Sequence, residues 1–317
     1  MKFTRWHDQI RRLFGHDVWS LGLVEQSAVD IVRNGLTAPV RWLAPPVWTF
    51  LADPFVLPEP DGGWRLFAER MSYIHGKADI WSGRLNPARG RRWVDLKPLL
   101  SADAHMSFPF AFEVDGRRYL LCETWEAGAA SLYVEDGGSW RFDTMLTPDG
   151  ATMVDAALHH DGERWWMFCC HPGRRPMANL YVYHAPHPRG PWTPHPLNPV
   201  VRRAASARPA GPLFRDGAAL IRPAQDCSAT YGGALVFNRV VELSPTAYRE
   251  EVVRRIGPVQ PYGLGLHAIC PAGEVTIIDG RRWRMHPLDP LRKLIFGGRA
   301  GQRRAELRRL WPVKPSA

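Results

Sequence analysis

The sequence has no long hydrophobic run: no stretch approaches the roughly 20 uninterrupted apolar residues that a membrane-spanning helix needs. Its first residues, MKFTRWHDQIRRLFG, carry charges every few positions and lack the apolar core and small-residue cleavage site of a secretory signal. We therefore expect a cytoplasmic protein, either soluble or peripheral to a membrane.

Cysteine is scarce as well. The five cysteines are an odd number without CxxC spacing, and four of them lie in or beside apolar strand-like runs. This pattern is typical of reduced, buried thiols and argues against a disulfide framework or a zinc site. We expect neither a metal ion nor another cofactor.

Acidic residues are outnumbered, and the positive excess is confined to one end of the chain. Of the formal net charge of +10, residues 281–317 contribute nine, with eleven Lys and Arg against Asp289 and Glu306. The rest of the chain is nearly balanced, which argues against a nucleic-acid-binding face. Nucleic-acid binding through the tail alone would weaken steeply with salt. The basic tail favours peripheral contact with the inner face of a membrane instead.

From Arg41 onward, short apolar runs alternate with turn residues, which is the signature of all-β structure. Five pairs of runs form similar hairpins: LADPFVL-(PEPDGG)-WRLFAE, SFPFAFE-(VDG)-RRYLLCE, MVDAALH-(HDGE)-RWWMFCC, PAGPLFR-(DG)-AALIRPAQD and GLHAIC-(PAG)-EVTIID. Their equivalent positions, at intervals of 56, 46, 56 and 56 residues, are Asp53, Pro109, Asp155, Gly211 and His267. A repeat of about 50 residues that begins with a hairpin is typical of a four-stranded propeller blade. We therefore predict an all-β fold, a five-bladed β-propeller, rather than a β-sandwich.

We divide the chain into an N-terminal lead-in (1–40), the five-bladed β-propeller (41–280) and a basic C-terminal tail (281–317). The lead-in begins with a predicted short helical segment. Residues 18–32 then predict a strand and a short helix that ends at Asn34-Gly35.

Residues 184–212 are rich in proline and show little periodicity. They predict a long connection across the face of the propeller, and long ordered loops of this kind often shape a binding site.

Three chemically active residues fall at equivalent positions of the repeat. The first strand of each blade lines the central channel, so Asp53, Asp155 and His267 are predicted to meet in one funnel. Both aspartates are flanked by apolar residues on either side, and a carboxylate in apolar sequence costs free energy unless it is paired or solvated. They are therefore candidate catalytic residues. The alternative is that each caps a turn or accepts from backbone amides at the channel mouth.

Further polar residues end the returning strands, namely Glu69, Glu123 and the pair Gln225-Asp226. Two carboxyl groups that flank a glycosidic bond are the usual minimum for cleaving it. Glu123 is the preferred proton donor because it lies in an apolar strand beside Trp125, and such surroundings raise the pKa of a carboxyl group. Glu69 is the alternative donor, or an ordinary ion-paired strand end.

Arg222 is another polar residue in an apolar run, where it can bind an anionic sugar or phosphate, or pair with Asp226 as a structural contact. Aromatic rings that could stack on a sugar fall next to the predicted channel positions: Trp48, Phe108, Trp125 and Tyr231.

Several of these motifs together resemble a known family. LADPF with its DGGWRLFAE hairpin, SFPFAFEVDGRRYLLCET, VDAALHHDGERWWMF, LIRPAQDCSATYGGALVFNRVVEL and GLHAI look like the N-terminal propeller domain of plant glucosamine inositolphosphorylceramide transferases and its bacterial relatives. That family is similar in fold to five-bladed glycoside hydrolases such as arabinanases and invertases. The resemblance covers roughly residues 40–280.

The resemblance implies roles for individual residues. In the hydrolases an Asp at the start of the first blade is nucleophile or base, a second Asp supports the transition state, and a Glu is the acid. Asp53 matches the first role through its ADPF context, Asp155 is the candidate for the second, and no motif decides between Glu123 and Glu69. In the plant proteins a separate glycosyltransferase domain follows the propeller, and 317 residues leave no room for it.

We therefore predict a carbohydrate-active propeller that acts on a sugar or glycolipid, as a glycoside hydrolase-like or transglycosylating enzyme of polysaccharide or glycolipid biosynthesis. Asp53, Asp155 and Glu123 are the predicted catalytic residues. The predicted substrate-binding residues are Glu69, Arg222, Gln225, Asp226, His267, Trp125 and Phe108. The competing prediction is a non-catalytic glycan-binding or scaffolding propeller that assists a separate glycosyltransferase.

Overall fold

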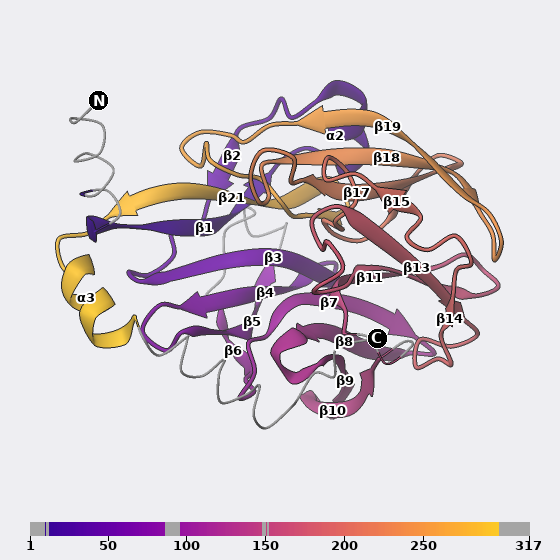
Figure 1. Cartoon of the computed structure of the whole chain (residues 1–317), viewed down its shortest axis with the longest axis horizontal. Coiled ribbons are helices and arrows are strands. Elements are labelled where there is room, and N and C mark those ends of the chain that lie inside the picture. Colours follow the sequence, from indigo (N-terminus) through magenta and orange to yellow (C-terminus); the bar gives the residue numbers. More distant parts are fainter. Residues whose placement is uncertain (1–9, 11–12, 86–95, 148–149, 151, 298–317) are drawn as a thin grey trace.

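The computed structural model describes residue 10 and residues 13–85, 96–147, 150 and 152–297. Five antiparallel sheets follow one another around a central axis, which confirms the predicted five-bladed β-propeller (Figure 1). The predicted helical start and most of the basic C-terminal tail lie outside the described residues.

Each blade is built from strands that are consecutive in the sequence, except the last. The first sheet contains β3 (Thr49–Pro58), β4 (Trp64–Ser72), β5 (Lys77–Leu85) and β6 (Lys97–Leu100). The second contains β7 (Ser107–Val114), β8 (Arg117–Thr124), β9 (Ala129–Asp136) and β10 (Ser139–Leu146). The third contains β11 (Val154–His160), β12 (Trp165–Cys170), β13 (Asn179–Ala185), β14 (Thr193–Pro194) and β15 (Val201–Arg202). The fourth contains β16 (Phe214–Asp216), β17 (Ala219–Asp226), β18 (Ala234–Leu243) and β19 (Tyr248–Ile256).

The fifth sheet joins the two ends of the chain. It contains β20 (Ile269–Ala272), β21 (Val275–Met285), β1 (Gly15–Val24) and β2 (Val40–Trp42). β1 pairs with β21 over ten residues, from Gly15 opposite Met285 to Val24 opposite Thr276. The fifth sheet therefore takes β1 from the predicted lead-in and continues in β21 through Met285, past residue 280.

The remaining regular elements are short. α2 (Ala28–Asn34) follows β1, with Ser27 Oγ accepting from the Asp30 amide at its start and Gly35 at φ 84° after its end. This agrees with the predicted strand, short helix and stop at Asn34-Gly35. A 3-10 helix, η2 (Trp125–Ala127), follows β8, and α3 (Asp289–Phe296) follows β21. Within the described part of the chain, neither α2 nor α3 has the length and apolar character needed to cross a membrane.

A bulge recurs where the innermost strand of a blade passes the axis. The register with the second strand shifts between Ala52 and Phe55 and again between Val154 and Ala157. Asp53 and Asp155, the first residue inside each bulge, both have a φ of 51°. Left-handed backbone is costly for a residue other than glycine, so these conformations are held by the surrounding structure.

The second blade carries the same bulge one residue earlier than the repeat predicts. Its register shifts between Ser107 and Phe110, and the left-handed residue is Phe108 with a φ of 46°. Phe108 rather than Pro109 is therefore the structural equivalent of Asp53 and Asp155. A bulge adds a residue without changing the apolar pattern, so the hairpin alignment could not place it.

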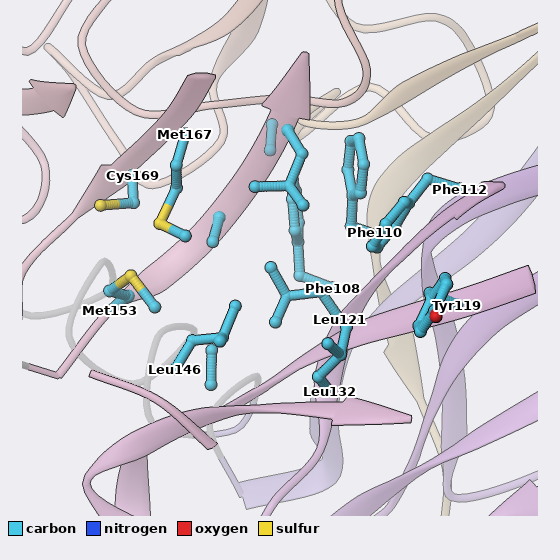
Figure 2. Close-up of a cluster of buried hydrophobic side chains, with 14 of the residues drawn as sticks. Phe108, Phe110, Phe112, Tyr119, Leu121, Leu132, Leu146, Met153, Met167 and Cys169 are labelled. Atoms are coloured by element: carbon cyan, nitrogen blue, oxygen red, sulfur yellow. The ribbon is translucent and has the colours of Figure 1, made fainter. Parts of the chain in front are cut away.

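The spaces between blades are filled by apolar side chains. The largest cluster joins the first three blades and includes Phe108, Phe110, Phe112, Leu121 and Met167 (Figure 2). All five cysteines are free, and four of them are buried, in agreement with the expected reduced thiols.

Candidate active site

The bulges and loops at one end of the channel enclose a cavity of about 200 Å³. Its wall contains residues from all five blades: Trp19, Phe50, Ala52, Asp53, Glu69, His105, Ser107, Glu123, Asp155, Arg208, Tyr231 and His267. Four of these are buried carboxylates, and three more carry or can carry positive charge. A cavity of this size suits one small ring rather than a drug-sized ligand, since pockets for the latter measure about 300–1,000 Å³.

Two side chains, the guanidinium of Arg208 and the amide of Gln225, hold Asp155. Its Oδ2 lies 2.5 Å from Arg208 Nε and accepts from Gln225 Nε2 at 3.1 Å. Gln225 also donates to the Pro209 carbonyl at 2.9 Å, which fixes its orientation. Since the Asp155 and Arg208 side chains are only 5% and 10% exposed, the ion pair is shielded from water.

Glu123 lies beside this pair. Its Oε2 accepts from the Asp155 amide at 2.9 Å, and its carboxyl group lies close to that of Asp155. Burial and the negative charge of Asp155 raise the pKa of Glu123 well above its usual range, although Arg208 opposes the shift. Within this Glu123–Asp155 dyad, Glu123 therefore holds a proton more tightly than an isolated glutamate does.

Asp53 and Glu69 form a second dyad across the cavity. Their carboxyl groups lie close together, and Glu69 Oε1 lies 3.3 Å from His105 Nε2. Burial raises the pKa of Asp53 well above its usual range, and the charges of Glu69, Asp155 and Asp279 add to the shift. Asp53 therefore holds a proton more tightly than an isolated aspartate does.

Asp279 fixes the backbone around the second dyad. Its Oδ1 accepts from the amides of His267 and Ala268 at 3.0 and 2.9 Å, and its Oδ2 accepts from the Asp53 amide at 3.3 Å. His267 Nδ1 lies 2.6 Å from the same Oδ2, while His267 Nε2 lies 3.9 Å from Asp53 Oδ1. One fully buried carboxylate thus connects the first and fifth blades at the cavity.

Three aromatic or cationic groups complete the wall near His267. The Trp19 ring stacks on the imidazole with centroids 3.9 Å apart, and the Tyr231 ring meets it edge-on at 5.3 Å. Arg208 lies 5.2 Å over the Tyr231 ring. These contacts fix the His267 and Arg208 side chains in place around the carboxyl groups.

One trio among the described residues could offer ligands to a metal ion. Ligand atoms of Asp53, His267 and Asp279 lie within 4.8 Å of one another. Both Asp279 oxygens already accept backbone hydrogen bonds, however, so their lone pairs are directed at amides. We therefore assign no metal ion to this trio.

The structure brings five predicted site residues to the cavity wall: Asp53, Asp155, Glu123, Glu69 and His267. Gln225 lies directly behind them as a partner of Asp155.

Arg222 and Asp226 lie elsewhere. Arg222 is fully buried and donates to both oxygens of Glu250, at 2.7 and 2.8 Å, rather than to Asp226. Asp226 pairs with Arg255 at 2.8 Å. Both residues thus form structural ion pairs within the fourth blade, away from the cavity.

The predicted aromatic subsites are mostly absent from the cavity. Phe108 is a core residue packed edge-on against Phe55 at 4.9 Å, and Trp48 Nε1 donates to Asp289 at 3.0 Å. Trp125 begins η2, and its side chain falls outside the part that the structure describes. Tyr231 alone of this group lines the cavity.

Sequence reasoning missed Arg208, Asp279 and Trp19. Asp279 ends the returning strand of the fifth hairpin, as Glu69 and Glu123 do in theirs, so the repeat contained the signal for it. Arg208 lies in the proline-rich connection predicted to shape a site, although nothing in that stretch distinguishes it from Arg202 or Arg203. Trp19 enters the cavity only because β1 joins the fifth sheet.

Comparison with known proteins now decides the family. The profile of the family described as glucosamine inositolphosphorylceramide transferase 1, N-terminal, matches residues 26–258. The chain belongs to this family. The match spans the site residues of the first four blades.

Plant members of the family are similar over part of their length. Glucosamine inositolphosphorylceramide transferase 1 of Arabidopsis thaliana is 33% identical over 208 residues, which is 63% of this chain and 27% of the plant protein. Its counterpart in Oryza sativa subsp. japonica is 28% identical over 266 residues, which is 78% of this chain and 35% of the rice protein. The chain thus spans about a third of the length of these relatives.

Solved structures with the same fold include glycoside hydrolases. A family 117 glycoside hydrolase of the marine bacterium Zobellia galactanivorans has a TM-score of 0.51 at 11% identity, covering 74% of this chain and 85% of the hydrolase. An exo-beta-1,3-galactanase from Clostridium thermocellum has a TM-score of 0.50 at 10% identity, covering 68% and 53%. At such identities the likeness concerns the fold alone.

Proposed function

We propose that this chain is a carbohydrate-active enzyme that cleaves or transfers a glycosyl group of a sugar or glycolipid. Glu123 is the proton donor, and the Asp53–Glu69 dyad on the opposite side is the base or nucleophile. The observation that carries the proposal is the gathering of two carboxyl pairs, Glu123 with Asp155 and Asp53 with Glu69, in the wall of one cavity.

The protonation pattern suits glycosidic bond cleavage. The reaction needs a carboxyl group that still holds its proton at neutral pH and a second group that carries negative charge. Burial beside Asp155 gives Glu123 the first property, since it raises the pKa of Glu123. The Asp53–Glu69 pair supplies the second group in this proposal, and His105 and His267 lie beside it, at 3.3 Å from Glu69 and 3.9 Å from Asp53.

Asp155, Arg208 and Gln225 have a supporting role in this proposal. The Asp155 carboxylate pairs with Arg208 and Gln225, and its charge both raises the pKa of Glu123 and stabilises positive charge that develops on the sugar ring. The names of the plant relatives and of the two hydrolases, which concern sugars, agree with a carbohydrate substrate.

The second candidate is a glycan-binding propeller that assists a separate glycosyltransferase. One observation favours it: the family profile describes an N-terminal part, and the plant transferases are about three times as long as the matched region.

Turnover separates the two candidates. Purified chain is incubated with a panel of nitrophenyl glycosides, and released nitrophenol is measured for wild type, Asp53→Asn, Glu123→Gln and the control Glu113→Gln. Glu113 is an exposed residue on the same hairpin as Glu123. We expect release by wild type and the control, a loss of about 100-fold or more in Asp53→Asn, and a smaller loss in Glu123→Gln, because nitrophenolate leaves without a proton. Glycoside binding without release from any substrate would support the glycan-binding candidate instead.

A further inference from the structure

Helix α3 packs on the propeller with its polar side inward. Asp289 is fully buried, and its carboxylate lies 2.6 Å from His16 Nδ1 and accepts from Trp48 Nε1 at 3.0 Å and Arg292 Nε at 3.1 Å. Lys293 Nζ donates to the carbonyls of Leu13 and Gly15. These buried polar contacts set the orientation of the helix.

The apolar side of α3 therefore faces outward. Leu294 is 83% exposed, and Leu291 and Ile295 are each about half exposed. Leu288, just before the helix, and Leu13, which Lys293 holds nearby, are also half exposed. Soluble proteins rarely expose such a contiguous aliphatic patch without a partner for it. Figure 1 shows α3 standing beyond the ends of β1 and β21, so the patch projects from the propeller.

The charge of this part of the sequence indicates which kind of partner the patch binds. Residues 281–317 carry eleven Lys and Arg against two acidic residues. Arg284 lies opposite His16 in the β1–β21 pairing, next to the buried Asp289. Exposed aliphatic side chains in a segment whose sequence is rich in Lys and Arg are the pattern of segments that insert into an anionic lipid surface. A second copy of this chain would place like charges opposite each other, which disfavours self-association.

The patch also lies close to the candidate active site. The Arg292 guanidinium lies 5.0 Å over the Tyr73 ring, and the Tyr73 ring lies 6.0 Å from that of Phe50, which lines the cavity. Only two side chains separate α3 from the cavity. A lipid surface bound at α3 would therefore be near the cavity wall.

We propose that the outward face of α3, formed by Leu288, Leu291, Leu294 and Ile295, docks the propeller onto an anionic membrane surface. The aliphatic side chains enter the headgroup–acyl boundary, and the basic residues around them pair with lipid phosphates. Docking does not depend on the proposed glycosyl chemistry.

The test is sedimentation of the full chain with vesicles of phosphatidylcholine, with and without phosphatidylglycerol. The variant Leu291→Ser/Leu294→Ser removes the two central leucines, and Val252→Ser/Val253→Ser is the matched control, since these valines of β19 are 50% and 38% exposed. We expect wild type and control to bind the anionic vesicles, with binding that weakens as salt rises. The leucine variant should bind about 100-fold more weakly, since burying one leucine side chain changes an equilibrium by about tenfold or more. Unchanged circular dichroism would show that it still folds.

Three results would overturn the proposal. The first is wild-type binding that does not depend on phosphatidylglycerol, or no binding to vesicles at all. The second is full binding by the leucine variant, which would assign the effect to charge alone. The third is a wild-type dimer that the leucine variant loses while neither binds vesicles, which would make the patch an interface between copies.

Discussion

Replacing Glu123 with glutamine should change how the stability of the fold depends on pH. Burial and the charge of Asp155 raise the pKa of Glu123 above its ordinary value of 4.5. The folded chain therefore keeps a proton that the unfolded chain releases above that pH. The stabilisation from this proton is complete below the ordinary pKa and is lost as pH rises toward the folded pKa. In the wild type, Glu123 accepts from the Asp155 amide at 2.9 Å. Glutamine keeps an oxygen for this hydrogen bond but cannot ionise.

The size of the effect follows from the number of protons. One proton held only by the folded state lowers the free energy of unfolding by about 1.4 kcal/mol for each pH unit. Above about pH 4.5, Glu123→Gln should gain stability relative to wild type at this rate until the folded Glu123 ionises. Urea unfolding at successive pH values measures this difference directly.

The control for this experiment is Glu113→Gln, which changes an exposed glutamate on the same hairpin and should show no such slope. A constant difference between Glu123→Gln and wild type across the pH range would refute the reasoning, because it would mean that Glu123 ionises as readily in the folded chain as in the unfolded one.

Two further predictions concern buried charges. Asp279→Ala leaves three buried backbone amides without their acceptor, including those of Asp53 and His267. This variant should lower the free energy of unfolding by about 3 kcal/mol or more. Asp279→Asn keeps one acceptor oxygen and should lower it by less. Equal losses in urea unfolding would contradict the proposed connection between blades. Arg222→Met leaves Glu250 buried without its counter-ion and should cost about 3–5 kcal/mol, part of which Arg222→Met/Glu250→Gln recovers. Additive losses in the double variant would show that the two side chains act independently.

Local sequence predicted the blades well because each hairpin carries its own turn and apolar pattern. The start LADPF and its DGG turn predicted β3 and β4, and the repeat placed Asp53, Asp155 and His267 at one channel end, where the structure brings them together. The pairing of β1 with β21 could not be predicted in the same way, because residues about 260 positions apart share no local signal.

The failures at single residues have similar causes. Arg222 was interpreted from its apolar neighbours, but its partner Glu250 comes from β19, an exposed-looking strand whose register only the fold fixes. The hairpin alignment predicts Pro109 as the equivalent of Asp53 and Asp155, whereas the bulge puts Phe108 at this position, because hairpin patterns do not show where a bulge begins. Arg208 reaches Asp155 from an irregular segment, where neither periodicity nor turn residues indicate the direction of a side chain.

The role of Glu123 as the proton donor is the central claim, and its dependence on the leaving group tests it most directly. Glu123→Gln is compared with wild type on a nitrophenyl and a methyl glycoside of the same sugar, because nitrophenolate leaves without protonation and methoxide does not. For Glu123→Gln we expect a loss of about 100-fold to 10,000-fold in kcat/KM on the methyl glycoside and a much smaller loss on the nitrophenyl glycoside. Equal losses on both substrates, or full activity of the variant on the methyl glycoside, would contradict it.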